Sequence, residues 1–114
     1  MHSDFKNKPI YIKAKELYVL INKAVSNKTP YALKDQILRS AISIILNFSE
    51  GYGRFTNNDK KNFYIIARAS LNETIACFDL LSLHETISET KTRTFELLTV
   101  ELQKMLSALI NSQK

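Results

Sequence analysis

Apolar residues recur along most of the chain at intervals of three and four positions, the spacing of amphipathic helices. No segment shows the two-residue alternation of a half-buried strand. Pro9 and Pro30 suit the starts of helices, and Thr56 precedes Asp59 in a helix-capping pattern. We expect an all-α protein, an antiparallel up-down four-helix bundle in a single domain over residues 9–114, after a frayed segment. The predicted elements are the frayed residues 1–8 and helices over 9–26, 31–50, 57–85 and 89–111.

The second predicted helix is unusually apolar, because eight of the twelve residues from 37 to 48 are apolar. A surface helix carries one apolar stripe, so a helix that is apolar around most of its circumference is buried on more than one side. A chain of this size cannot easily surround one of its own helices, so we expect this helix to face a partner subunit as well as the core. The residues assigned to that oligomer interface are Ile42, Ile45, Leu46 and Phe48. Two polar residues near its end, Asn47 and Glu50, either cap the following turn or face another subunit.

The turn after this helix contains the only two glycines of the chain, Gly51 and Gly53. Glycine readily adopts the positive backbone angles that end a helix, so we expect both residues to serve that purpose. Basic and aromatic residues gather around the turn. Phosphate neutralisation and base stacking are the two contacts that RNA needs, although a solvated loop has much the same composition. The candidate nucleic-acid contacts are Arg54, Lys60, Lys61, Tyr52 and Phe55.

One carboxylate lies within a row of the third helix that is otherwise apolar. Glu73 follows Ile66 and Ala69 at helical spacing, and a buried carboxylate requires a partner. The second and third helices run antiparallel, which places Arg39 and Glu73 at roughly 18 Å and roughly 22 Å from the turn that joins them. We therefore predict a structural ion pair between Arg39 and Glu73.

Charge is distributed unevenly along the 114 residues. The net charge is +5, but residues 1–61 hold 11 basic and 5 acidic residues, a net charge of +6, whereas residues 62–114 carry −1. A basic first half favours anionic partners. Cys77 is the only cysteine, which fits a reducing compartment, and no apolar run is long enough to span a bilayer. We expect a cytoplasmic protein that does not contact membranes.

Residues that could support catalysis are few. Cys77 and His84 lie two helical turns apart, too far for a nucleophile and its base and too few for a metal site, so we assign Cys77 to the core. The Gly51-Tyr52-Gly53 segment lacks the strand and the Lys-Ser/Thr pair of a phosphate-binding loop. We expect no enzyme activity, no metal and no cofactor.

Three motifs indicate a family. They are Leu33-x-x-Gln36-Ile37-x-Arg39-x-Ala41-x-Ser43-Ile44, then Asn47-Phe48-Ser49-Glu50-Gly51-Tyr52-Gly53-Arg54, then Ala67-Arg68-Ala69-Ser70-Leu71-x-Glu73. In these motifs the chain resembles the bacterial four-helix-bundle proteins known as 23S ribosomal RNA intervening-sequence proteins or S23 ribosomal proteins. Leu38 stands where the family has the first arginine of a pair, which weakens any role for that pair in gripping nucleic acid.

The resemblance implies an antiparallel four-helix bundle that assembles as a ring-like homopentamer, with the second helix near the subunit contacts. Members are encoded within insertions in ribosomal RNA genes or elsewhere in bacterial chromosomes. They are also similar to the accessory proteins of diversity-generating retroelements, basic pentamers that contact nucleic acid and a reverse transcriptase. The leading hypothesis is a non-catalytic oligomer that binds RNA or DNA. The alternative is a protein-interaction scaffold that docks a partner such as a reverse transcriptase or an rRNA-processing factor.

Overall fold

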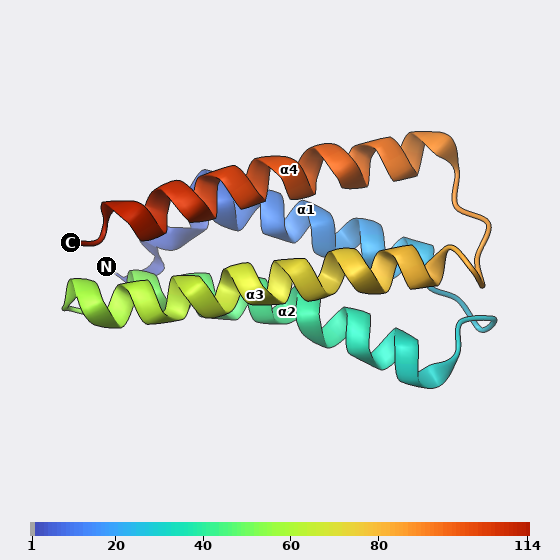
Figure 1. Cartoon of the computed structure of the whole chain (residues 1–114), viewed down its shortest axis with the longest axis horizontal. Coiled ribbons are helices and arrows are strands. Elements are labelled where there is room, and N and C mark those ends of the chain that lie inside the picture. Colours follow the sequence, from blue (N-terminus) through green and yellow to red (C-terminus); the bar gives the residue numbers. More distant parts are fainter. Residues whose placement is uncertain (1) are drawn as a thin grey trace.

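Four helices that alternate in direction form the molecule, and the computed structural model describes residues 2–114 (Figure 1). No strand occurs in the described part of the chain, so the all-α four-helix fold is confirmed. The helices are α1 (Pro9–Ala24), α2 (Tyr31–Tyr52), α3 (Asn57–Leu81) and α4 (Glu89–Ser112).

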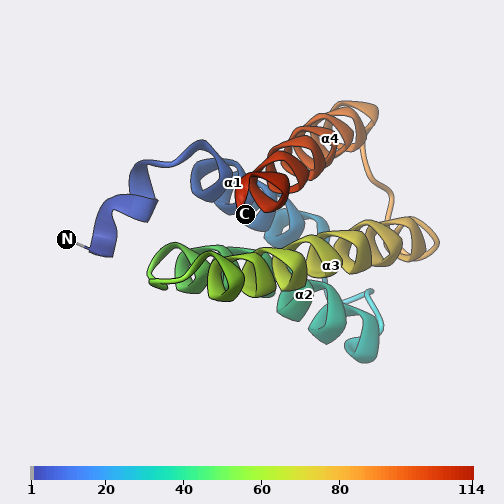
Figure 2. The ribbon, with the colours of Figure 1, turned by 60° about the vertical axis from the view of Figure 1, so that its left-hand side comes forward.

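The start of the chain is more ordered than we expected. A short 3-10 helix, η1 (His2–Asn7), replaces most of the segment predicted to be frayed, and Met1 lies outside the described residues. The ring of Phe5 packs edge-on against that of Tyr11, with 5.1 Å between the ring centres. Figure 2 shows η1 standing to one side of the four helices.

The capping residues determine where α3 and α4 begin. The side chain of Thr56 accepts a hydrogen bond from the backbone N–H of Asp59, as the capping pattern predicts. At α4 the cap is Ser88, whose side chain accepts from the N–H of Lys91.

The first and third helices end earlier than the pattern indicated. Helix α1 stops at Ala24 because Val25 adopts an extended backbone. Helix α3 stops at Leu81, and Glu85 turns towards the α1–α2 loop. There its Oε2 accepts hydrogen bonds from the hydroxyls of Ser26 at 2.6 Å and Thr29 at 2.5 Å. Both hydrogen bonds stabilise the ionised carboxylate and so lower the pKa of Glu85, and the bond from Ser26 has the larger effect.

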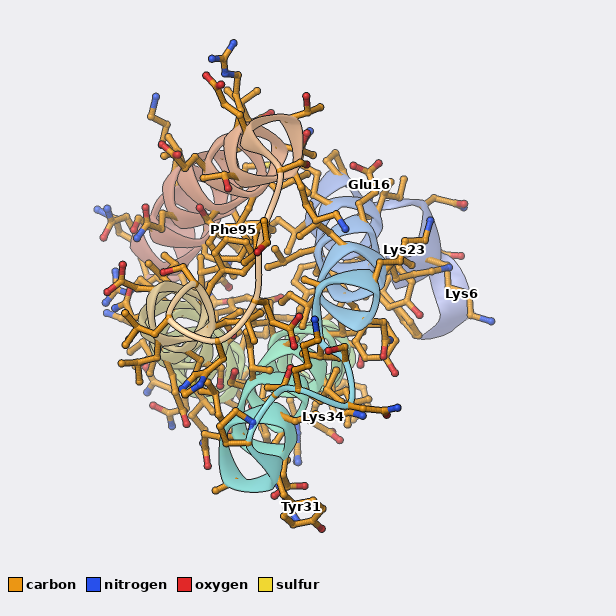
Figure 3. All side chains as sticks on the ribbon, turned by 90° about the vertical axis from the view of Figure 1, so that its right-hand side faces the viewer. Lys6, Glu16, Lys23, Tyr31, Lys34 and Phe95 are labelled. Atoms are coloured by element: carbon orange, nitrogen blue, oxygen red, sulfur yellow. The ribbon has the colours of Figure 1, made fainter. Side chains whose placement is uncertain are left out.

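The core runs along the inside of the bundle and is almost entirely apolar. Phe78 of α3 and Phe95 of α4 stack with 3.7 Å between their ring centres, and Figure 3 shows Phe95 inside the bundle. By contrast, Tyr31 at the start of α2 points outward in the same view. Large side chains buried completely are Leu17, Ile21, Ile37, Ile44, Leu71, Leu81, Leu102 and Leu106.

Small polar residues line the contact between α2 and α3. The Thr74 hydroxyl lies 2.8 Å from that of Ser40, and the Ser43 and Ser70 hydroxyls are 2.7 Å apart. Pairs of this kind satisfy buried hydroxyl groups and allow the two helix backbones to come close together. They also fix the antiparallel register of α2 against α3.

Gly51 has a different purpose from the one we predicted. Neither glycine has a positive φ, and Gly51 lies inside α2. A Cβ atom at Gly51 would lie 2.7 Å from Cε1 of Tyr64 and 3.0 Å from Cβ of Phe63. Glycine is therefore needed here because α3 approaches closely, and only Gly53 stands at the end of the helix.

The predicted ion pair between Arg39 and Glu73 is wrong. Arg39 instead pairs with Asp35 one turn earlier on its own helix, with Nε and Oδ2 2.8 Å apart. Glu73 is exposed and accepts a hydrogen bond from the side chain of Gln36. The prediction failed because the row of α3 that contains Glu73 faces outward and not into the core.

That outward row contributes to an exposed apolar surface over α2 and α3, which we call the outer face. Leu46 is 59% exposed, and Ile42 is exposed beside it on α2, whereas Ile45 is partly buried. Phe48 was wrongly assigned to a subunit interface. It belongs to the buried row of α2 and is only 2% exposed. The members of the outer face are Ile42, Leu46, Ile66, Ala69, Ala76 and Leu80.

Candidate nucleic-acid interface at the α2–α3 turn

The α2–α3 turn lies at the same end of the bundle as both chain termini (Figure 1). The side chain of Asn57, in the first turn of α3, donates a hydrogen bond to the backbone oxygen of Lys114, at 2.9 Å. Alternation of helix direction also brings the start of α1 to this end. The turn is therefore surrounded by segments that are far apart in the sequence.

Lys60 closes the end of α2. Its ammonium group donates to the carbonyl oxygens of Tyr52 at 2.8 Å and Gly51 at 3.4 Å, and it lies 5.6 Å from the centre of the Tyr52 ring. A cation at this position satisfies carbonyls that have no helical partner and opposes the negative end of the helix dipole. Lys60 thus has a structural task, which a simple list of basic residues does not reveal.

Arg54 is also engaged within the chain. Its Nε lies 3.2 Å from Oε2 of Glu50, and its guanidinium carbon lies 4.7 Å from the centre of the Phe63 ring. Glu50 thus lies beside the turn and partly neutralises it. Exposed pairs of this kind contribute little to stability, so Arg54 can leave Glu50 for a phosphate at small cost.

Of the five predicted contacts, Phe55 and Lys61 are the two that are exposed and not engaged within the described chain. Phe55 is 94% exposed, and Lys61 is exposed one turn into α3. Neither side chain has a hydrogen bond, ion pair or ring contact within the part of the chain that the structure describes. An exposed aromatic ring can stack on a base, and an unpaired ammonium group near the same turn can neutralise a phosphate.

Tyr52 is less available than Phe55. It is partly buried, and its ring centre lies 6.1 Å from that of Phe48. The ammonium groups of Lys8 and Lys60 both lie 5.6 Å from its ring centre. Beneath it, Tyr64 packs against Phe48, and burial, with a smaller effect of Tyr52, raises the pKa of the Tyr64 hydroxyl.

Lys8 is the residue that our reading of the sequence missed. It precedes α1, more than 40 residues from the turn in the sequence, and the fold brings it against Tyr52. A signal was present, since an up-down bundle places the start of its first helix and its second turn at the same end. The basic groups at this end therefore come from three segments: Lys8, Arg54, and the pair Lys60 and Lys61.

A hollow beneath the turn, which we call the end cavity, has a volume of about 650 Å³. All four helices and the segment before α1 contribute to its wall. The residues that line it are Lys8, Pro9, Ile10, Phe48, Tyr52, Lys60, Tyr64, Met105, Ala108, Leu109 and Gln113.

Three features of the described chain concern metal binding, its cysteine and membranes. Among the described residues, no three His, Cys, Asp or Glu side chains gather closely enough to hold a metal ion. Cys77 is buried in the core as predicted, and burial, with a smaller effect of Glu73, raises the pKa of its thiol. None of the helices in the described chain is long and apolar enough to cross a lipid bilayer.

Comparison with known proteins decides the family. Residues 6–108 match the family described as 23S rRNA-intervening sequence protein. The chain belongs to this family. The family match spans all three motifs on which we based the resemblance and connects the chain with 23S rRNA intervening sequences. No curated protein matches the chain in sequence.

A solved structure supports the same assignment to the 23S rRNA-intervening sequence family. It is the crystal structure of a protein of unknown function from the S23 ribosomal protein family of Bacteroides thetaiotaomicron VPI-5482. The two chains are 27% identical and superpose with a TM-score of 0.79, over 90% of this chain and 99% of that chain. The shared architecture therefore covers most of the domain.

Proposed function

We propose that the protein is a non-catalytic oligomer that binds RNA and is connected with 23S rRNA intervening sequences. The observation that carries this proposal is the exposure of an aromatic ring, Phe55, and of a lysine, Lys61, neither of which has a partner among the described residues, at a basic end of the bundle. Burying an aromatic ring normally stabilises a protein, so a ring left in solvent favours a binding role. RNA is the favoured ligand because unstacked bases in its loops and bulges can stack on such a ring.

Assembly would strengthen a modest basic surface. The chain has a net charge of +5, and a ring of several copies would present several α2–α3 turns to one polyanion. Multiple weak contacts from linked sites give a much higher apparent affinity than one site alone. The ring-like homopentamer implied by the family resemblance would supply this repetition.

The outer face is the surface that we assign to the contact between subunits. Leu46 and Ile66 are exposed on adjacent helices, and the Ser43–Ser70 pair places them at nearly the same height. Contiguous exposed apolar side chains mark interaction sites in soluble proteins. Substituting Leu46 with glutamate should therefore reduce the mass measured by light scattering to that of the monomer, while the helical circular dichroism is retained.

The test of RNA binding uses a fluorescent stem-loop RNA from a 23S rRNA intervening sequence, titrated with protein at low salt. Replacing Phe55 with alanine should weaken binding about tenfold, since stacking contributes about 1–3 kcal/mol per base. Lys28→Ala in the α1–α2 loop, at the opposite end, removes one positive charge and serves as the control. The Lys28→Ala control should bind as tightly as the unmodified protein. The proposal fails if the RNA does not bind, or if Phe55→Ala binds as tightly as this control.

A protein-interaction scaffold is the second candidate. It is favoured by exposed apolar side chains on helices away from the outer face, namely Ile12 and Val19 of α1 and Leu97 and Val100 of α4. A reverse transcriptase or an rRNA-processing factor would be retained on these surfaces without nucleic acid. A partner that stays bound after nuclease treatment and a high-salt wash would support the scaffold. Release of every partner by nuclease would support the RNA-binding proposal.

A further inference from the structure

The end cavity combines an apolar wall with two positive charges. Met105 and Leu109 of α4 and Phe48 of α2 are among the apolar side chains that line it. No acidic side chain lines the cavity, although Lys8 and Lys60 both do. Its volume of about 650 Å³ falls within the range of roughly 300–1,000 Å³ typical of small-molecule sites.

The two ammonium groups are not neutralised within the described residues. Lys60 donates to backbone carbonyls only, and no ion pair with a carboxylate involves either lysine. The nearby Glu50 is already paired with Arg54. Both ammonium groups lie 5.6 Å from the centre of the Tyr52 ring, and all three residues line the cavity.

We propose that the end cavity binds a small amphipathic carboxylate, with its hydrocarbon body between α2 and α4 and its carboxylate against Lys8 and Lys60. A charge-assisted hydrogen bond from an ammonium group is the strong contact available to a carboxylate. Methionine fits irregular apolar ligands because its side chain is flexible and polarizable, and Met105 provides such a contact.

The lining argues against other small ligands. A nucleotide needs several donors and acceptors around its base and sugar, whereas the uncharged polar side chains here are Tyr52, Tyr64 and Gln113. An inorganic anion would leave the apolar wall without a partner. A medium-chain fatty acid satisfies both the charge and the apolar surface, and it requires no nucleic acid, so this site is independent of the proposed RNA contact at Phe55 and Lys61.

The experiment titrates the full chain with decanoate below its micelle concentration, without RNA, by isothermal calorimetry and by tyrosine fluorescence. The chain has five tyrosines and no tryptophan, and two of the tyrosines line the cavity. Decanoate should bind with one site per chain, and decanol should bind at least tenfold more weakly because it lacks the charge. Absence of saturable decanoate binding, or equal affinity for decanol, would overturn the proposal.

Variants locate the site. Lys8→Met should weaken decanoate binding about tenfold, whereas Lys6→Met, on η1 and outside the cavity lining, should leave it unchanged. Ala108→Phe places a ring at the cavity wall and should abolish binding, with circular dichroism to verify the fold. Equal affinities of the Lys8 and Lys6 variants would place the ligand elsewhere. Loss of decanoate binding in the Ala108→Phe protein, with RNA binding retained, would separate the two sites.

Discussion

Gly51 provides a sharp test of the packing between α2 and α3. Its replacement by alanine adds one methyl group, which would lie 2.7 Å from a ring carbon of Tyr64 and 3.0 Å from Cβ of Phe63. The Phe63 Cβ is attached directly to the backbone, so relief requires α3 to shift. Overpacking of a core costs about 1–3 kcal/mol, and the better helix propensity of alanine returns about 1 kcal/mol.

At the middle of these ranges the net effect of Gly51→Ala is a loss of about 1 kcal/mol, which corresponds to a decrease in Tm of roughly 4–8 °C for a domain of this size. Thermal and urea unfolding followed by circular dichroism measure it. Gly53→Ala is the matched control, since the nearest atoms to its added Cβ are backbone oxygens at 3.8 and 3.9 Å. Its stability should change by less than about 0.5 kcal/mol. If the two variants unfold at the same temperature, close approach of α3 is not the reason for Gly51.

Three further predictions concern the side chains of Thr74, Glu85 and Cys77. Thr74→Val keeps the shape of the side chain but removes the hydroxyl that contacts Ser40, so urea unfolding should show a loss of about 1 kcal/mol; an unchanged midpoint would contradict this. The pKa of Glu85 is lower in the folded state than its ordinary value of 4.5, so its contribution is complete above that pH and is lost as the pH falls through the lower folded pKa. The difference in Tm between the unmodified protein and Glu85→Gln should therefore shrink on acidification below pH 4.5; a constant difference would refute the role of the Glu85 charge. The Cys77 thiol is buried with a raised pKa, so it should react with a maleimide far more slowly in the native protein than in urea; equal rates would show that the site is open.

The helices were predictable because their periodicity and caps are local properties. Pro9 and Thr56 begin helices for reasons that depend on neighbouring residues alone, and both starts are confirmed. The predicted ends of α1 and α3 were less accurate than their starts. Glu85 leaves the helical path to bond with Ser26, a contact between residues 59 positions apart that no local pattern reveals.

The direction in which each helix face points was harder to predict than the helices themselves. The row that contains Glu73 is apolar and was assigned to the core, but the Ser–Thr contacts between α2 and α3 turn it outward. An apolar row predicts burial, without distinguishing the core of one chain from a contact between chains. The same ambiguity placed Phe48 at an interface when its row faces the core.

The candidate site was predictable in part. The predicted residues do gather at the glycine turn, but Arg54 pairs with Glu50 and Lys60 caps α2, so Phe55 and Lys61 are the two predicted contacts without a partner in the described chain. Lys8 and the end cavity depend on the return of α1 and α4 to this end of the bundle. Because this return belongs to the tertiary structure, no local sequence pattern predicts that these residues come together.

The salt dependence of RNA affinity tests the proposed function most directly. Each phosphate neutralised by a lysine should add about 0.7–0.9 to the slope of log affinity against log salt. We expect a steep linear decrease for the unmodified protein, a shallower slope for Lys61→Ala and an unchanged slope for Lys28→Ala. A slope near zero, or the same slope for both lysine variants, would contradict the assignment of the α2–α3 turn as the RNA contact.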